Sequence, residues 1–239
     1  MPRTRRWLTN WGLVIIDALT LRVVFPILAV GVAVIASQKG WGLFNILALP
    51  LWLEITLAVV LLDLLIYAQH VLSHKVPLLW RLHKVHHVDR DIDVTTGARF
   101  HPLEILFSMV YKMLCVLLVG PAAAAVILFE VILNGSAMFN HANVRLPKKL
   151  DALLRSVIIT PDMHRVHHSV IAGETDSNYG FFLSCWDRWF GTYVEEPRDG
   201  HDGMTIGLAV YQDNRPASLW WSLLLPFKPV RRSRVTGNE

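Results

Sequence analysis

Cysteine and charge are both scarce in this sequence, and each shortage excludes a class of protein. Only two of the 239 residues are cysteines, Cys115 and Cys185, and they form no CxxC motif. The sequence therefore has neither a disulfide framework nor a zinc–thiolate site, and its soluble face is expected in a reducing compartment. Charged residues make up 18% of the chain and are sparse before residue 140. This composition is typical of an integral membrane protein.

Several cofactor and nucleic-acid signatures are missing as well. The sequence has no HExxH motif and no Glu-x-x-His pair, which mark zinc proteases and soluble carboxylate-bridged di-iron bundles. It has no haem-binding His-Pro-Gly-Gly segment, no ferredoxin cysteine pattern and no GxGxxG loop, so any reducing equivalents must come from a separate electron donor or reductase. Its one dense basic run is Arg231, Arg232 and Arg234, which gives no support to nucleic-acid binding.

The most prominent feature of the sequence is its long apolar runs. A membrane span needs about 20 mainly apolar residues, and four segments meet or approach that length: 19–37, 44–68, 103–119 and 121–139. Gly120 and Pro121 predict a tight turn that makes the last two an antiparallel helical hairpin. The predicted fold is an all-α integral membrane bundle of four transmembrane helices with a cytosolic histidine-rich helical cap.

The distribution of Lys and Arg predicts the orientation of these spans. Arg3, Arg5 and Arg6 place the N-terminus in the cytosol, and the loop after the first span carries only Lys39. Four crossings then return the C-terminus to the cytosol. The prediction has a cytosolic segment 1–18, a membrane region 19–142 that includes a cytosolic segment 69–102, and a cytosolic cap 143–239. Residues 219–230 are expected either as a helix lying in the membrane interface or as an ordinary packed helix.

Histidines lie in three clusters at metal-ligand spacing, joined by one isolated histidine. The members are His70 and His74; His83, His86 and His87; His141; and His164, His167 and His168. On a helix, residues four apart stand one above the other, so the first pair can reach one metal. In each HxxHH cluster we expect the i and i+3 histidines to share a face, while the last points about 100° away. Each cluster could then address two metals, which predicts a dinuclear site.

The type of ligand limits the choice of metal at such a site. Imidazole-only ligation suits iron, zinc, copper or nickel, and the lack of carboxylate and thiolate ligands argues against magnesium, calcium and iron–sulfur clusters. The choice is mainly between iron and zinc.

The residues around the histidines resemble the fatty acid hydroxylase and sterol desaturase superfamily of membrane di-iron enzymes. The resemblance covers roughly residues 44–195, with one fatty acid hydroxylase-type domain at about 55–195. The matching runs are Asp63, Tyr67, His70 and His74; 83–87; Arg99-Phe-His-Pro-Leu-Glu104; Phe139-Asn-His-Ala-Asn143; Thr160-Pro-Asp-Met-His-Arg-Val-His-His168; Glu174-Thr-Asp-Ser-Asn-Tyr-Gly180; and Trp186-Asp-Arg-Trp-Phe-Gly-Thr-Tyr193.

The resemblance implies two irons that activate O2 and attack an unactivated C–H bond of a lipid, with zinc as a possible substitute metal. It implies hydroxylation or desaturation of a sterol, fatty acyl or related lipid. No catalytic residue is expected apart from the nine histidine ligands. Further residues are expected to orient the imidazoles through hydrogen bonds: Asp63, His101, Glu104, Asp176 and Asn178.

One position departs from the family pattern. Family hydroxylases often carry a further ligand one helical turn before the position of His141, and this sequence has Ala137 there. Either one metal has an open or water-filled position, which we favour, or His101 or Asn134 substitutes.

A different class of protein fits some of the same features. A non-catalytic zinc or iron binder or transporter would also carry histidine clusters in a membrane protein. Transport, however, places polar ligands near mid-bilayer in interrupted helices, whereas these clusters are expected at helix ends. The sequence therefore favours the oxidoreductase.

Overall fold

Helices form all the regular structure between residues 2 and 228, the part of the chain that this computed structural model describes. This range has no strand, and only two isolated bridges join Ile158 to Leu183 and Ser169 to Ile206. The predicted all-α class is confirmed. The α-helices are α1 Arg3–Val24, α2 Ala29–Lys39, α3 Leu43–Ile46, α4 Leu51–Lys75, α5 Pro77–His87, α6 Pro102–Val119, α7 Ala123–Asn140, α8 Lys148–Leu154, α9 Pro161–His167, α10 Ala172–Thr175, α11 Cys185–Trp189, α12 Gly200–Gly203 and α13 Leu219–Leu224. The short 3₁₀ helices are η1 Thr96–Ala98, η2 Ala209–Tyr211, η3 Arg215–Ala217 and η4 Leu225–Phe227.

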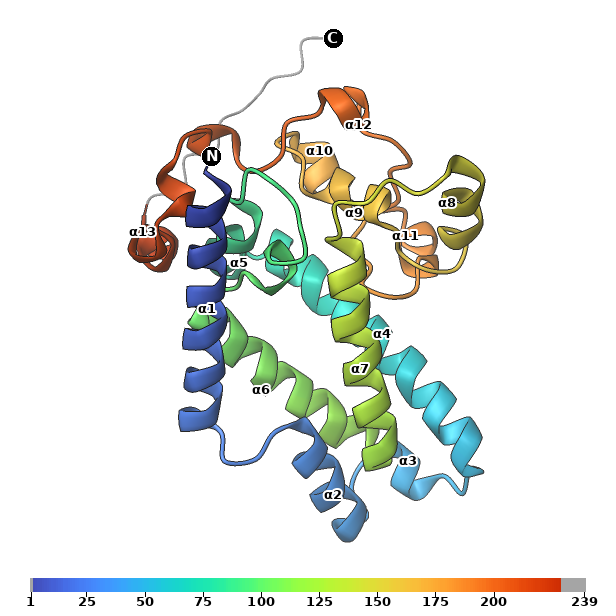
Figure 1. Cartoon of the computed structure of the whole chain (residues 1–239). Helices are drawn as coiled ribbons and strands as arrows, with labels where there is room; N and C mark the ends of the chain where they lie inside the picture. Colours follow the sequence, from blue (N-terminus) through green and yellow to red (C-terminus); the bar gives the residue numbers. More distant parts are fainter. Residues whose placement is uncertain (1, 229–239) are drawn as a thin grey trace.

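Most of the short helices lie together at one end of the molecule, whereas α2 and α3 lie at the other end (Figure 1). Among the described residues, four helical segments are long and apolar enough to cross a membrane: Arg3–Ile46, Leu51–Lys75, Pro102–Val119 and Ala123–Asn140. The chain is thus an integral membrane protein. We call α5 and α8 to α13 the short-helix layer. It lies at the end of the long helices where α1 begins.

The first predicted span is wrong in its bounds. The expected helix 19–37 is interrupted at residues 25–28, where α1 ends and α2 has not yet begun. Pro26 explains the break, because a proline lacks the backbone N–H and disfavours helical geometry at the residue before it. Phe25 is accordingly extended. Most of the predicted N-terminal segment 1–18 is itself helical, as the first part of α1.

The other three spans were predicted more closely. The second begins at Leu51, after Pro50, rather than at residue 44, and the third and fourth are confirmed within about two residues as α6 and α7. The turn between these two is tight, with Gly120 in the left-handed conformation at φ 64°.

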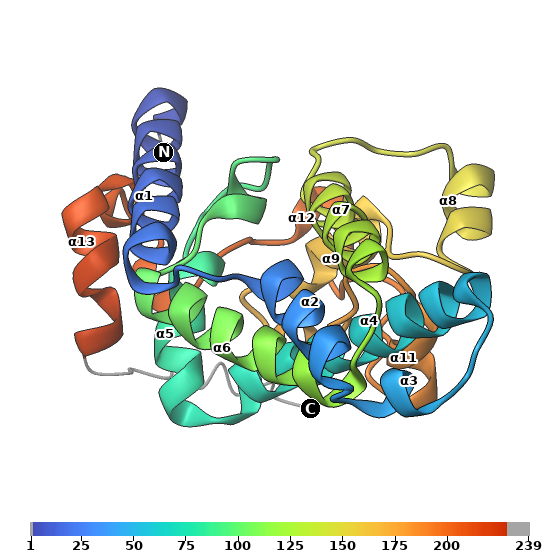
Figure 2. The ribbon, with the colours of Figure 1, turned by 90° about the horizontal axis from the view of Figure 1, so that it is seen from below.

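The predicted hairpin of α6 and α7 is nevertheless splayed. The two helices diverge from their turn (Figures 1 and 2), because α2 packs against both. Ala29, Ala33 and Ala36 of α2 are fully buried, and small side chains of this kind allow helices to approach closely. A half-buried ion pair, Lys112 Nζ to Glu130 Oε1 at 3.2 Å, bridges the diverging helices.

A buried ionic network fastens α1 to the loop that follows α5. Arg6 is 2% exposed and donates to Asp89 at 3.1 Å, to Thr96 at 3.2 Å and to Asp93. Arg99 is fully buried and donates to Asn10 of α1 at 2.6 Å. The residues 3–10 are therefore a packed part of the histidine-bearing end, not a free segment.

The C-terminal part of the described chain packs beside α1. Arg99 also donates to Pro216 O at 3.0 Å and to Ser222 Oγ at 2.8 Å, so α13 is held by the same network. Trp220, Leu224 and Phe227 point outward and are exposed. The predicted interfacial helix is thus a short helix with one packed face and one exposed apolar face. Its last two predicted residues, 229 and 230, and the basic run 231–234 lie outside the described residues.

Replacing Asp89 tests this network. We expect Asp89→Asn to lower stability by about 3 kcal/mol, because it removes the fully buried carboxylate that compensates the buried charges of Arg6 and Arg99 and leaves only Asp93 beside Arg6. The measurement is the thermal midpoint of the detergent-solubilised protein. The matched control is Asp91→Asn, since the Asp91 carboxylate is 4.0 Å from Arg6 and 57% exposed. Equal midpoints for the two variants would contradict the role given to Asp89.

Candidate metal centre

The nine predicted ligands come together in two buried groups. Within each group one nitrogen from every imidazole lies within 4.8 Å of the others, and each of these side chains is less than 5% exposed. The first group is His70, His74, His83, His87 and His167, and the second group is His86, His141, His164 and His168.

Each HxxHH cluster is divided between the two groups, but not as predicted. His83 and His87 share the first group, and the intervening His86 belongs to the second. The i and i+4 residues, rather than the i and i+3 residues, therefore share a face. At about 100° per residue, positions i and i+4 are about 40° apart around the helix, whereas i and i+3 are about 60° apart. The third cluster is divided in the same way, with His164 and His168 together.

Four chain segments present these histidines, and each is shaped by local sequence. His70 and His74 lie in the last turns of α4, and α5 begins with Pro77 in its first turn, where a missing N–H costs nothing. His141 is the residue that ends α7. Helix α9 starts at Thr160-Pro161, with the threonine hydroxyl accepting from Met163 N.

Hydrogen bonds fix the proton of several imidazoles on Nδ1. In the first group, the Nδ1 atoms of His70, His83 and His167 lie 2.7 Å from Tyr179 O, 2.6 Å from Glu104 Oε1 and 2.7 Å from Ser177 O. In the second group, His141 Nδ1 lies 2.7 Å from Ala137 O. Carbonyl and carboxylate oxygens only accept, so each Nδ1 must donate. In the neutral form of each of these rings, the Nε2 atom then carries a lone pair.

These lone pairs point at one another. His70 Nε2 lies 3.2 Å from His83 Nε2, and neither has a proton to donate. His141 Nε2 lies 3.3 Å from His86 Nε2 and 3.0 Å from His164 Nε2. Other buried ring nitrogens have no hydrogen-bond partner: both nitrogens of His74, Nε2 of His167, and Nδ1 of His86, His87, His164 and His168. Converging lone pairs in a buried site are the donor arrangement that a cation satisfies.

Burial favours the uncharged form of several of these imidazoles. It lowers the pKa of His87 and of His168 well below the usual value for histidine. It also lowers the pKa of His167 to about 3 and that of His141 to about 4. Neighbouring histidines lower these pKa values further. Neutral imidazole is the form that binds metals, so these four histidines are ready to ligate at neutral pH.

The short stretch 177–179 orients one histidine on either side of Asn178. Ser177 O accepts from His167 and Tyr179 O accepts from His70. Asn178 between them is fully buried with φ 47°, a conformation that Asn tolerates better than most residues. Its side chain donates to Met163 O at 2.9 Å and accepts from Val194 N at 2.9 Å. Asn178 thus positions two carbonyls through the backbone rather than touching an imidazole itself.

Two buried carboxylates hold the same loop against α4. Asp187 accepts from Tyr179 N at 2.8 Å with one oxygen and from Gly180 N at 2.9 Å with the other. Asp63 of α4 accepts from Trp186 Nε1 at 2.7 Å and from Leu183 N at 3.1 Å. Asp63 was expected to bond a histidine, but its hydrogen bonds go instead to the loop that carries the carbonyls.

The other predicted orienting residues divide into two that reach a ligand and one that does not. Glu104 accepts from His83, and Asp176 Oδ1 lies 3.4 Å from His74 Nδ1. Both ring nitrogens of His101 are used elsewhere, with Nε2 3.1 Å from Leu223 O and Nδ1 accepting from Leu103 N. His101 therefore neither orients a ligand nor replaces the one missing at Ala137.

Asn134 does not fill that position either. It is exposed, and its side chain donates to Glu130 O at 2.7 Å. The two groups consequently hold five and four histidines, and Ala137 contributes a backbone carbonyl to His141. Sequence reasoning missed the carbonyls of Ser177 and Tyr179, because every residue has a carbonyl and only the loop conformation selects one.

Comparison with known proteins agrees with the geometry. Residues 55–192 match the fatty acid hydroxylase family, and the chain belongs to it. It is 29% identical over 190 residues to ornithine lipid hydroxylase OlsE of Rhizobium tropici, covering 80% of this chain and 55% of that protein. No solved structure matches.

More distant relatives carry other names. The chain is 29% identical over 188 residues to alkylglycerol monooxygenase of Xenopus tropicalis, which covers 76% of this chain and 40% of that protein. It is 25% identical over 141 residues to cholesterol 25-hydroxylase of Rattus norvegicus, with 58% and 46% covered. The chain spans about half the length, or less, of these three relatives.

Asp187→Asn tests how the carbonyl-bearing loop is held. Because each carboxylate oxygen accepts from a different backbone N–H, an amide must turn its NH2 group toward one of them. We expect a loss of about 1–3 kcal/mol, the cost of an unsatisfied buried donor, read as a lower thermal midpoint. Asp199→Asn is the control, since Asp199 is exposed and bonds only its neighbour Arg198. A midpoint for Asp187→Asn that matches this control would overturn the assignment.

Proposed function

We propose that this chain is a membrane di-iron oxidoreductase that uses O2 to hydroxylate a lipid. The observation that carries the proposal is the pair of buried histidine groups with converging Nε2 lone pairs. The names of the relatives support the reaction, since they are lipid or sterol hydroxylases and monooxygenases. Hydroxylation is therefore preferred to desaturation.

The donor set supports two metals. The first group would hold one with His70, His74, His83, His87 and His167, and the second would hold the other with His86, His141, His164 and His168. Imidazole-only ligation suits iron and leaves zinc as a substitute. When bound, the irons would supply the activation of O2 that C–H oxidation needs. The electrons would come from a separate donor.

The residues of the chain prepare this site in three ways. Burial excludes bulk water from both groups. The carbonyls of Ser177, Tyr179 and Ala137 hold the Nδ1 protons and so keep Nε2 free for the metal. The Glu104 carboxylate does the same for His83. Its negative charge would make the Nε2 atom of that imidazole a stronger electron-pair donor to a metal than the Nε2 atoms of its neighbours.

We place the histidine groups and both termini on the cytosolic side. The segment between the second and third spans carries Lys75, Arg81, Lys84, Arg90 and Arg99, which favours that side by the positive-inside rule. A reductant and O2 would then reach the site from the cytosol. A lipid would reach it from the bilayer.

Metal content and lipid products test the function together. We expect the purified chain to hold two irons, and His86→Ala and His87→Ala each to lose metal from one group and to abolish product formation. Metals are measured by mass spectrometry of the protein. Products are measured as lipids that gain one oxygen in cells that express the chain. His201→Ala is the control, because His201 belongs to neither group.

The outcomes separate the candidate functions. Zinc at one per chain with an unchanged lipidome would defeat the oxygenase proposal and favour a non-catalytic metal binder. A lipid lighter by two hydrogens would replace hydroxylation with desaturation.

Glu104 variants test the orientation of one ligand. We expect Glu104→Ala to weaken metal binding by about 10–100-fold, as for other groups that bond a metal-ligating histidine. Glu104→Gln keeps an oxygen that can accept from His83 Nδ1, so it should lose less. The measurement is iron retained against increasing chelator. Retention by the alanine variant equal to that of the native chain would exclude this role.

A further inference from the structure

A small apolar cavity lies between α1, the segment 94–98 and α7. Its volume is about 110 Å³. That is smaller than, but comparable with, an apolar cavity of about 150 Å³ that stays dry and binds benzene. The lining residues come from these three segments: Asn10, Trp11, Val14, Val94, Thr95, Ala98 and Met138.

The polar side chains of the lining are already satisfied. Asn10 Nδ2 donates to Thr95 Oγ1 at 2.9 Å and to Asp89 at 3.1 Å, and Asn10 Oδ1 accepts from Arg99 at 2.6 Å. Thr95 Oγ1 donates in turn to Asp93 at 2.6 Å. The amide and hydroxyl groups of the lining are therefore not free for a headgroup, and the surface of the cavity is almost entirely apolar, which favours a hydrocarbon occupant.

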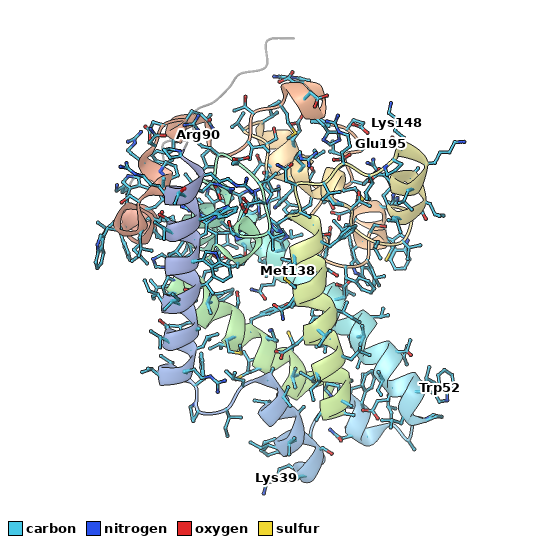
Figure 3. The ribbon with its side chains drawn as sticks, viewed as in Figure 1. Lys39, Trp52, Arg90, Met138, Lys148 and Glu195 are labelled. Carbon is cyan, nitrogen blue, oxygen red and sulfur yellow. The ribbon has the colours of Figure 1, made fainter. Side chains whose placement is uncertain are left out.

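The cavity adjoins the membrane-facing sides of two spans. Trp11 and Ile15 of α1 and Val131 and Met138 of α7 are all more than half exposed. They follow one another at spacings of four and seven residues, so each pair lies on one helix face. Figure 3 shows Met138 on the side of α7 that faces α1. A chain in the bilayer would meet the cavity between these helices.

The opposite wall adjoins the second histidine group. A Cβ at Gly97 would lie 3.0 Å from His141 Nδ1 and 3.1 Å from Ala137 O, so the backbone there packs directly on the imidazole. Ala98 follows Gly97, and Met138 follows Ala137. The cavity is thus separated from His141 by one layer of backbone.

We propose that this cavity holds part of the hydrocarbon chain of a bilayer lipid and guides it toward the second histidine group. The guiding role of the cavity rests on the proposed function, because it presupposes a lipid that is oxidised at the histidine groups. Lipid occupancy itself, however, does not depend on turnover.

Photolabelling tests occupancy directly. The full chain is placed in phosphatidylcholine vesicles in which one acyl chain carries a diazirine, and labelled peptides are identified after trypsin digestion. Residues 91–99 form one tryptic peptide, between Arg90 and Arg99, and contain three lining residues. We expect this peptide to be labelled in the native chain.

Two variants should remove that labelling from opposite walls. Met138→Trp fills the cavity from α7, and Val14→Trp fills it from α1. The control is Leu118→Trp, which adds the same ring at an exposed position of α6 outside the cavity. Folding of each variant is checked by its thermal midpoint, and Met138→Leu should keep the labelling of the native chain.

The results distinguish this proposal from the function itself. Label in 91–99 that is lost in both tryptophan variants and kept in the control supports the cavity, even if no oxidised lipid is ever found. Equal labelling in native and variant chains overturns it, even if lipid oxidation is demonstrated. In an active preparation, Met138→Trp should also lower product formation without changing the iron content.

Discussion

Nine imidazoles that face one another in a buried space determine which hydrogen-bond acceptors and charges the surrounding residues must supply. A ring that keeps its proton on the outward nitrogen needs an oxygen acceptor behind it, and His70, His83, His141 and His167 have one. The acceptors for His70 and His167 come from residues 177–179, and the acceptor for His83 comes from α6. The inward lone pairs repel one another until a cation lies between them. Metal binding at these groups, as proposed, would therefore stabilise this end of the molecule, as in other sites that form only in the folded chain.

The two sides of the histidine groups are held by different buried charges. On one side, Asp63 and Asp187 fasten the carbonyl-bearing loop to α4 through backbone and tryptophan N–H groups. On the other side, Arg6 and Arg99 join α1 to the loop after α5 and to α13. Arg99 also donates to Val85 O, one residue before His86. Both networks connect a membrane helix to the short-helix layer, so the position of the imidazoles depends on the spans as well as on the layer.

The sequence was sufficient to predict which histidines meet and where the last two spans lie, because both follow from residue type and spacing. It also predicted the contact of Glu104 with a ligand. It did not predict the break at Pro26 within the mainly apolar run 19–37. The division of each HxxHH cluster was wrong because the difference between i+3 and i+4 is small on a helical wheel. The roles of Ser177, Tyr179 and Asn178 depend on a left-handed residue in a loop, which no residue pattern specifies.

The two histidine groups differ in size, and the smaller group is the one that lies near the apolar cavity. The smaller group contains His141, and Ala137 stands one turn before it with only a backbone carbonyl to offer. Gly97 packs against the same imidazole, and its neighbour Ala98 lines the apolar cavity. The group with fewer donors is thus the one that borders hydrocarbon-lined space. A side chain ligand at residue 137 would stand next to Met138, at the wall of this cavity. The position that lacks a side-chain ligand and the cavity therefore lie on the same side of the second histidine group. An apolar substrate and an open metal position would have to meet on that side.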